Sequence, residues 1–118
     1  MKTKALNLPV SEAVAVGEML YLWGQIGNKP GGLSVVEGGI QKETRQTMKN
    51  IFRGLKKYST SPEKIVKCTI FLASMNEWGA INLAYIEALG SHRPARSALG
   101  ASGLTLNSKV QIKCILIR

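Results

Sequence analysis

Arg93-Pro94-Ala95-Arg96-Ser97 is the stretch at which the chain turns from its last helical segment into its last two apolar runs. Pro94 fixes its own φ and disfavours helical backbone at Arg93, so the stretch predicts a rigid, extended start to a strand. Such a strand would hold the Arg96 guanidinium still, and the planar fork of donors on that group fits a carboxylate. Arg96 is therefore a candidate anion-binding residue, although a surface or interface charge is the commoner role of an arginine.

Two apolar runs follow this stretch and predict strands over residues 97–101 and 109–117. The second run alternates between two sets of side chains, as a strand with two different faces does. One set is Val110, Ile112, Cys114 and Leu116, and the other is Gln111, Lys113, Ile115 and Ile117. We expect the first set to face helices. The second face is partly apolar, and exposed apolar area of that extent usually marks an interface, so we expect an oligomer.

The segment before the stretch predicts a strand and then a helix. Residues 65–73 are rich in apolar and β-branched residues, and Ser74-x-x-Glu77 is a capping box that would start a helix ending at Leu89, with Gly90 as its stop. The expected buried stripe of the helix is Trp78, Ile81, Tyr85, Ala88 and Leu89. In the strand, we expect Val66, Cys68, Ile70 and Leu72 on one face and Ile65, Lys67, Thr69 and Phe71 on the other.

A longer helix is predicted over residues 40–58, after Gly38-Gly39. Its apolar and threonine positions keep helical spacing, opposite a row of basic residues. The first set is Ile40, Thr44, Thr47, Met48, Ile51, Phe52 and Leu55, and the basic row is Lys42, Arg45, Lys49, Arg53 and Lys56. Such a row is usually the solvated face of an amphipathic helix, but the net charge of +9 also suits an anionic partner.

The first part of the chain predicts a β-hairpin. Residues 13–16 and 19–23 are short apolar runs separated by Gly17-Glu18. Residues 5–8 could add an edge strand, and Pro9 argues against a central one. The expected order is β-β-α-β-α-β-β, in which two helices can cover only one face of the sheet. We therefore predict a single α+β domain over residues 1–118, with one mixed sheet of about six strands and both helices on one face.

Composition narrows the function classes. No apolar run reaches the roughly 20 residues of a membrane span, and no signal peptide is evident, so we expect a cytoplasmic protein without membrane association. Cys68 and Cys114 lie in apolar alternating runs and are interpreted as buried free thiols rather than a disulfide or a metal site. With His92 as the only histidine and no Cys-x-x-Cys pair, a zinc centre is not expected.

Several landmarks, in order, resemble the RidA (YjgF) family of enamine/imine deaminases. They are Trp23-Gly24-Gln25-Ile26, Gly38-Gly39-Ile40, Thr44-Arg45-Gln46-Thr47, Asn50-Ile51, Val66-Lys67-Cys68-Thr69, Met75-Asn76-Glu77-Trp78, Asn82-Leu83-Ala84-Tyr85 and Pro94-Ala95-Arg96-Ser97. The resemblance implies a chorismate-mutase-like (YjgF-type) sandwich and a homotrimer with ligand clefts between subunits. It also implies hydrolysis of a 2-imino acid, or its enamine, to a 2-keto acid and ammonia, without a metal or cofactor.

The resemblance assigns site residues as well. Arg96 matches the family's carboxylate-binding arginine, and the backbone near Gly24 corresponds to the floor of the pocket. Asn82 matches an asparagine of the same cleft, although helix-to-strand packing would explain it equally well.

Gln111 stands at the position of the family's acid/base glutamate, and an amide cannot exchange a proton at neutral pH. Losing general acid–base help typically costs about 10²–10⁴-fold in rate.

Other positions also depart from the family pattern. Val10 replaces a pocket tyrosine, Trp23 a serine and Ala98 a cysteine, and Lys113 stands where many relatives have an acidic residue. Trp23 would make the cleft smaller or reshape it, and the added positive charge favours anionic ligands. A catalytic role for Lys113 is conceivable, since a buried lysine can lower its pKa, but nothing in the sequence requires it. We therefore expect a pocket that binds small carboxylates and hydrolyses the usual imines poorly or not at all.

Three functions remain open from the sequence. The first is a deaminase of reactive imines or enamines, and the second is a non-catalytic trimeric binder of small carboxylates such as imino or keto acids. The third is an RNA-related activity, as an endoribonuclease or translation inhibitor, which the resemblance and the positive charge allow. Nucleic acid is the least favoured partner, because there is no nucleic-acid motif and few aromatic residues interleave with the basic row.

Overall fold

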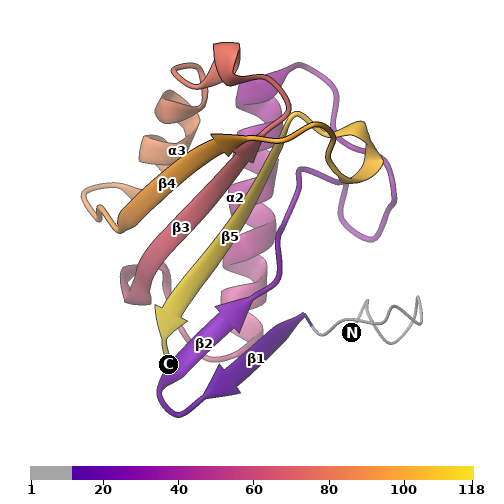
Figure 1. Cartoon of the computed structure of the whole chain (residues 1–118). Coiled ribbons are helices and arrows are strands. Elements are labelled where there is room, and N and C mark those ends of the chain that lie inside the picture. Colours follow the sequence, from indigo (N-terminus) through magenta and orange to yellow (C-terminus); the bar gives the residue numbers. More distant parts are fainter. Residues whose placement is uncertain (1–11) are drawn as a thin grey trace.

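The structure is a computed structural model that describes residues 12–118; Val10 and the edge strand expected over residues 5–8 lie outside the described residues. Its centre is a mixed sheet with strand order β1-β2-β5-β3-β4 (Figure 1). The strands are β1 (Ala13–Val16), β2 (Met19–Leu22), β3 (Ile65–Leu72), β4 (Ala95–Gly100) and β5 (Val110–Ile117). Strands β3 and β4 are parallel, and the other neighbours pair antiparallel. Both the predicted hairpin and the predicted element order are confirmed.

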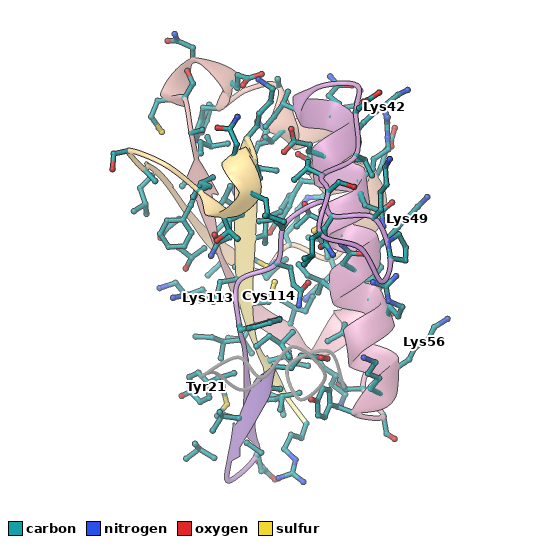
Figure 2. The ribbon with its side chains drawn as sticks, turned by 90° about the vertical axis from the view of Figure 1, so that its right-hand side faces the viewer. Tyr21, Lys42, Lys49, Lys56, Lys113 and Cys114 are labelled. Atoms are coloured by element: carbon teal, nitrogen blue, oxygen red, sulfur yellow. The ribbon has the colours of Figure 1, made fainter. Side chains whose placement is uncertain are left out.

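Two α-helices lie on one face of the sheet, as expected (Figures 1 and 2). They are α2 (Ile40–Lys57), which runs behind β5, and α3 (Ile81–Leu89), which crosses over from β3 to its parallel neighbour β4. Three short 3₁₀ turns complete the chain: η1 (Pro62–Lys64), η2 (Met75–Glu77) and η3 (Thr105–Asn107). No helix that residues 12–118 form is long and apolar enough to span a bilayer.

The core fills the space between the sheet and the helices. From the sheet it includes Ile70, Ile112 and Leu116, and from α2 it includes Met48 and Ile51, all at most 2% exposed. On β5 the predicted alternation is confirmed, since Val110, Ile112, Cys114 and Leu116 are all buried. Figure 2 shows Lys113 and Cys114 on opposite sides of this strand, with Cys114 toward the helices.

The predicted alternation of β3 is wrong at its start. Ile65 is 2% exposed and Val66 is 42% exposed, the reverse of what strict alternation requires. The cause is a register shift between Ile65 and Lys67 where β3 pairs with β5. Such a bulge adds one residue to one strand and reverses the facing of the residues before it. From Cys68 onward the predicted facing holds, because Cys68, Ile70 and Leu72 are buried.

The predicted start of the second helix is also wrong. The Ser74 side chain accepts a hydrogen bond from the Asn76 amide, at 3.3 Å, so it caps the short turn η2 rather than α3. The helix α3 begins at Ile81 and ends as predicted, with Gly90 in a positive-φ conformation (φ 64°). Trp78 precedes α3 and is 46% exposed, so it is not part of the buried stripe. The predicted residues Ile81, Tyr85 and Leu89 are buried.

Candidate functional site

Arg96 lies against α3 and is held by neighbours on that helix. On β4 it pairs with Cys68 of β3, which places it on the side of the sheet that the helices cover. One guanidinium nitrogen, Nη1, donates to the Asn82 side-chain oxygen at 2.8 Å. The guanidinium carbon lies 5.1 Å from the centre of the Tyr85 ring and 5.9 Å from that of Trp78. Contacts of this length between a cation and an aromatic face are attractive, so the side chain is ordered before any ligand arrives.

A cavity of about 250 Å³ opens beside this arginine. Its lining is Asn82, Tyr85, Ile86, Arg93, Pro94 and Arg96. Two of these side chains carry a positive charge, and among the described residues no carboxylate contributes to the lining. A small anion would therefore be attracted here, and Arg96 still has donors that Asn82 does not occupy.

Gln111 belongs to a second cavity, of about 340 Å³. The segment after β2 runs alongside β5, where the amide and carbonyl of Gln25 exchange hydrogen bonds with those of Ile112 at 2.8 and 2.9 Å. This pairing brings Trp23 and Gly24 next to Gln111. The complete lining is Trp23, Gly24, Gln25, Ile26, Asn28, Gly32, Leu33, Thr105, Leu106 and Gln111.

Gly24 forms part of the floor of this cavity because the Gln111 side chain packs on its backbone. A Cβ atom at Gly24 would lie 2.1 Å from the Gln111 side-chain nitrogen and 2.9 Å from its amide carbon. Real Cβ atoms do not approach other atoms that closely. Any larger residue at Gly24 would thus displace the Gln111 side chain.

The predicted site residues therefore form two groups that do not meet within one chain. Arg96 and Asn82 line the smaller cavity, and Trp23, Gly24 and Gln111 line the larger one. Gln111 pairs with Phe71, and Phe71 pairs with Leu99 on β4, so Gln111 lies on the face of the sheet without helices. Arg96 lies on the opposite face.

Lys113 shares the open face with Gln111. Its Nζ atom lies 5.7 Å from the centre of the Phe71 ring and within reach of solvent. Lys113 lines neither of the two cavities. Val10, the remaining predicted site residue, falls outside the described part of the chain.

Asn50 supports the second cavity, a role that the sequence analysis did not assign. It is 4% exposed, and its side-chain nitrogen donates to the Ile26 carbonyl at 2.9 Å and the Asn28 carbonyl at 3.1 Å. Its side-chain oxygen accepts from Gln46 at 3.0 Å and Arg53 at 2.9 Å. These bonds fix residues 26–28, part of the cavity wall, onto α2. The feature that could have indicated this role is an amide side chain at a buried position of the helix.

Tyr85 and Trp78 were likewise predicted only as core residues, whereas they pack on Arg96. Burial raises the pKa of Tyr85, so its hydroxyl stays protonated at neutral pH.

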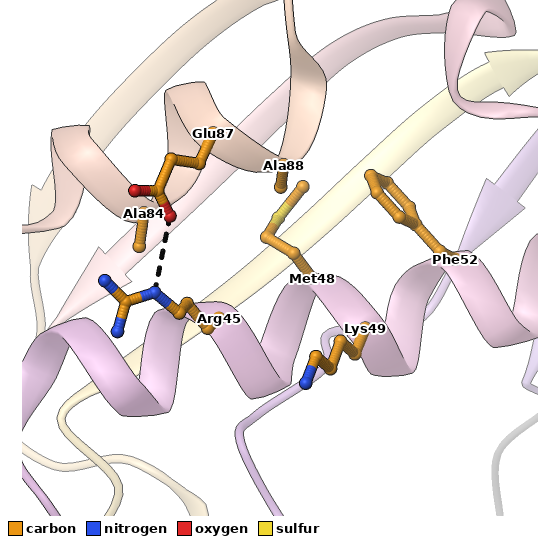
Figure 3. A pocket seen from close by; sticks show the side chains of 7 residues that line it. All are labelled: Arg45, Met48, Lys49, Phe52, Ala84, Glu87 and Ala88. Atoms are coloured by element: carbon orange, nitrogen blue, oxygen red, sulfur yellow. Dashed lines mark hydrogen bonds and ion pairs between the residues drawn. The ribbon is translucent and has the colours of Figure 1, made fainter.

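A third cavity, of about 250 Å³, lies between α2 and α3 and contains none of the predicted site residues (Figure 3). Met48, Phe52, Ala84 and Ala88 give it an apolar lining, and Arg45 pairs with Glu87 across it at 3.4 Å. The basic row of α2 borders this groove, and Lys42, Lys49 and Lys56 point away from the sheet (Figure 2). The three lysines of the row are thus exposed, as expected, whereas Arg45 and Arg53 are half-buried and hydrogen-bond to Glu87 and Asn50. RNA binding by the row stays an untested alternative.

The fold defines a class of protein. A mixed five-stranded sheet with both helices on one face is consistent with a chorismate-mutase-like α+β protein of the YjgF type. The family model described as "Endoribonuclease L-PSP" matches residues 3–117. The chain belongs to this family, which is the RidA (YjgF) family expected from the sequence.

Individual relatives agree with this assignment. The chain is 34% identical over 117 residues to the mouse (Mus musculus) protein named 2-iminobutanoate/2-iminopropanoate deaminase, covering 99% of this chain and 87% of the relative. A solved Rid-family protein of unknown function, YyfA from Yersinia pestis, is 36% identical with a TM-score of 0.89, covering 94% and 89% of the two chains. The Escherichia coli protein TdcF, solved with bound serine, is 26% identical with a TM-score of 0.85, covering 93% and 88%.

Proposed function

We propose that this protein hydrolyses small 2-imino acids to 2-keto acids and ammonia, with Arg96 binding the substrate carboxylate. The main support for the proposal is the position of the Arg96 guanidinium, which donates a hydrogen bond to Asn82 at 2.8 Å. It lies beside a cavity that, among the described residues, is lined by two arginines and by no carboxylate. The relatives of this chain support the choice of substrate, because two of them, at 34% identity, are named 2-iminobutanoate/2-iminopropanoate deaminase.

The proposed reaction needs no redox change. Water adds to the imine carbon of the bound 2-imino acid, the C–N bond then breaks, and ammonia leaves with a proton while the keto group forms. Arg96 would hold the carboxylate and thereby orient the imine carbon, which lowers the entropic part of the barrier. Gln111 can hydrogen-bond the attacking water but cannot take its proton. We therefore expect slow turnover compared with an enzyme that has a carboxylate at this position.

We further propose that a neighbouring copy of the chain completes each site. Reacting groups must lie within about 3–3.5 Å of their targets, and Arg96 and Gln111 of one chain lie on opposite faces of the sheet. The open face also exposes Tyr21, Leu99 and Ile117 by 42–43% each, which supports its use as an interface. In a homotrimer with clefts between subunits, one chain would supply Arg96 and Asn82 and its neighbour Trp23, Gly24 and Gln111.

The test is the rate of keto-acid release from freshly generated 2-iminobutanoate. The wild-type protein should exceed the spontaneous hydrolysis rate, and Arg96→Ala should bring the rate back to it. Arg93→Ala is the matched control, because Arg93 lines the same cavity but already donates to the carbonyls of Gly90 and His92. We expect Arg93→Ala to retain most of the activity. Equal rates for the wild type and Arg96→Ala would refute the proposed role.

A second candidate function is a non-catalytic binder of small carboxylates. One observation favours it: among the described residues, neither the Arg96 cavity nor the Gln111 cavity has a carboxylate in its lining that could act as a general base. The bound serine in TdcF is itself a small molecule with a carboxylate. Titration with 2-ketobutanoate and the hydrolysis assay together separate the two functions. Both functions require binding through Arg96, but a pure binder would leave imine hydrolysis at the spontaneous rate.

A further inference from the structure

Cys68 and Cys114 form a close pair in the core and line none of the three cavities described above. They are direct cross-strand partners of β3 and β5, and their sulfur atoms lie 2.9 Å apart. Direct partners in an antiparallel ladder have Cα atoms about 4.5–5.5 Å apart, which lies within the range found for disulfides. A disulfide needs about 2.05 Å between the sulfurs, so a shift of about 1 Å would close the bond.

The pair is enclosed on every side. Cys68 is 0% exposed and Cys114 is 1% exposed, and both are free thiols, as the sequence predicted. Arg96 of the edge strand β4 is the partner of Cys68 on its other side. Only a small, uncharged reagent could reach sulfur atoms that are buried this completely without unfolding the chain.

The surroundings of the two thiols shift their pKa values in opposite directions. The hydrogen bond between Cys68 and Cys114 lowers the pKa of Cys68 below its ordinary value; the charge of Arg96 acts in the same direction, and burial opposes both. The same hydrogen bond and burial raise the pKa of Cys114 well above its ordinary value. Since the thiolate is the nucleophile, Cys68 would react first and Cys114 would act as the resolving thiol.

We propose that Cys68 and Cys114 are a redox modification site that a peroxide converts into a reversible intrachain disulfide. The Cys68 thiolate attacks hydrogen peroxide, an S–O bond forms as the O–O bond breaks, and hydroxide leaves and takes up a proton. The Cys114 sulfur then attacks the Cys68 sulfenic acid, the S–S bond forms as the S–O bond breaks, and the Cys114 proton leaves with the second water. The two thiols lose two electrons, which reduce the peroxide to two waters. A dithiol such as dithiothreitol reverses the change by thiol–disulfide exchange.

The experiment treats the reduced, folded protein with hydrogen peroxide and measures its intact mass and its non-reduced peptide map. We expect a loss of about 2 Da, a peptide containing Cys68 joined to one containing Cys114, and full reversal by dithiothreitol. The same treatment of Cys114→Ser should give no loss of mass but a gain of oxygen at Cys68, located by the peptide map. Since this readout does not involve imino acids, it is independent of the proposed function.

A second measurement keeps the proposal testable even if the serine variant fails to fold. The wild type is oxidised both folded and in denaturant, and the yields of the intrachain link are compared. The proposal predicts that the folded protein forms it in higher yield, because the fold holds the sulfurs together. A link that forms only in denaturant would overturn the proposal. So would oxygen addition at Cys68 without a link, or disulfides between chains as the main product.

Discussion

At the scale of single residues, the site depends on how Arg96 is held. Its guanidinium is fixed by one hydrogen bond to Asn82 and by the rings of Tyr85 and Trp78. A long side chain that is already ordered loses less entropy when it binds a ligand, and immobilising such a side chain costs about 0.5–1.5 kcal/mol. Asn82 on α3 therefore positions Arg96 on β4, which is the helix-to-strand contact that the sequence allowed; a direct contact between Asn82 and a ligand stays a prediction.

We predict that Asn82→Ala weakens binding of 2-ketobutanoate about 3- to 10-fold, because Arg96 must then be ordered by the ligand itself. Isothermal titration calorimetry measures the affinity. Glu87→Ala is the control, since Glu87 is on the same helix but pairs with Arg45 on the side facing α2. An Asn82→Ala variant with wild-type affinity would mean that the Arg96–Asn82 contact contributes to folding only.

Sequence reasoning found Arg96, Asn82, Gly24 and Gln111 through their places in family motifs, not through their contacts. The physical reason is that they meet only through tertiary contacts, as two separate pairs: Arg96 meets Asn82 between β4 and α3, and Gly24 meets Gln111 where the segment after β2 runs along β5. Trp78 illustrates the limit: helical spacing placed it in the core, whereas the chain before Ile81 is a 3₁₀ turn that leaves it exposed beside Arg96. Propensity cannot distinguish these cases, because the outcome depends on tertiary contacts.

At the scale of elements, the hydrophobic periodicity predicted every strand and both α-helices of the described chain, with ends within about two residues except at the start of α3, which begins at Ile81 and not directly after Ser74. The α2 prediction ended one residue late, at Tyr58 instead of Lys57, and the β5 prediction began one residue early. Strict alternation of apolar and polar residues, as in the first half of β5, predicts a strand and its facing reliably, because only one face of such a strand can be buried. The bulge in β3 was not predictable, since Ile65 and Val66 are both apolar and β-branched and either could face the core.

We predict that Ile65→Ala lowers the free energy of unfolding by about 2–5 kcal/mol, as expected for a fully buried isoleucine. The neighbouring change Val66→Ala should cost less than about 1 kcal/mol, because Val66 is 42% exposed. Urea unfolding followed by circular dichroism measures both. The reverse order of the two effects would show that β3 has no bulge and alternates strictly from Ile65.

At the scale of the whole molecule, the separation of the Arg96 cavity from the Gln111 cavity supports the proposal that one chain alone is an incomplete site. The edge strand β4 presents the arginine side, and the open face of the sheet presents Gln111. The sequence predicted an oligomer from the apolar residues of that open face, but it could not indicate which residues come from which copy. The separation of Arg96 from Gln111 in the structure leads to the hypothesis that one chain supplies Arg96 and a neighbouring chain supplies Gln111.

We predict that the protein in solution has three times the 12.8 kDa mass of the chain, measured by light scattering during size-exclusion chromatography.

We also predict that two defective variants, Arg96→Ala and Gly24→Ala, complement each other when they are refolded together. A mixed trimer would contain a cleft with an intact Arg96 from one chain and an intact Gly24 and Gln111 from another. We expect Arg96→Ala alone to lose binding of 2-ketobutanoate with the guanidinium, and Gly24→Ala alone to weaken it through the displaced Gln111 side chain. Binding should therefore reappear in the mixture. If the mixture binds no more than the two variants do separately, the site is not shared between chains.

The central claim is that the carboxylate clamp is intact and that Gln111 limits the chemistry. The most direct test compares keto-acid release from 2-iminobutanoate by the wild type, Gln111→Glu and the double variant Arg96→Ala/Gln111→Glu. Supplying a carboxylate should raise the rate about 10²–10⁴-fold over the wild type, as general acid–base catalysis typically does. The double variant should lose that gain because the substrate is no longer held. A Gln111→Glu rate equal to that of the wild type, in a protein that folds and assembles normally, would contradict the account.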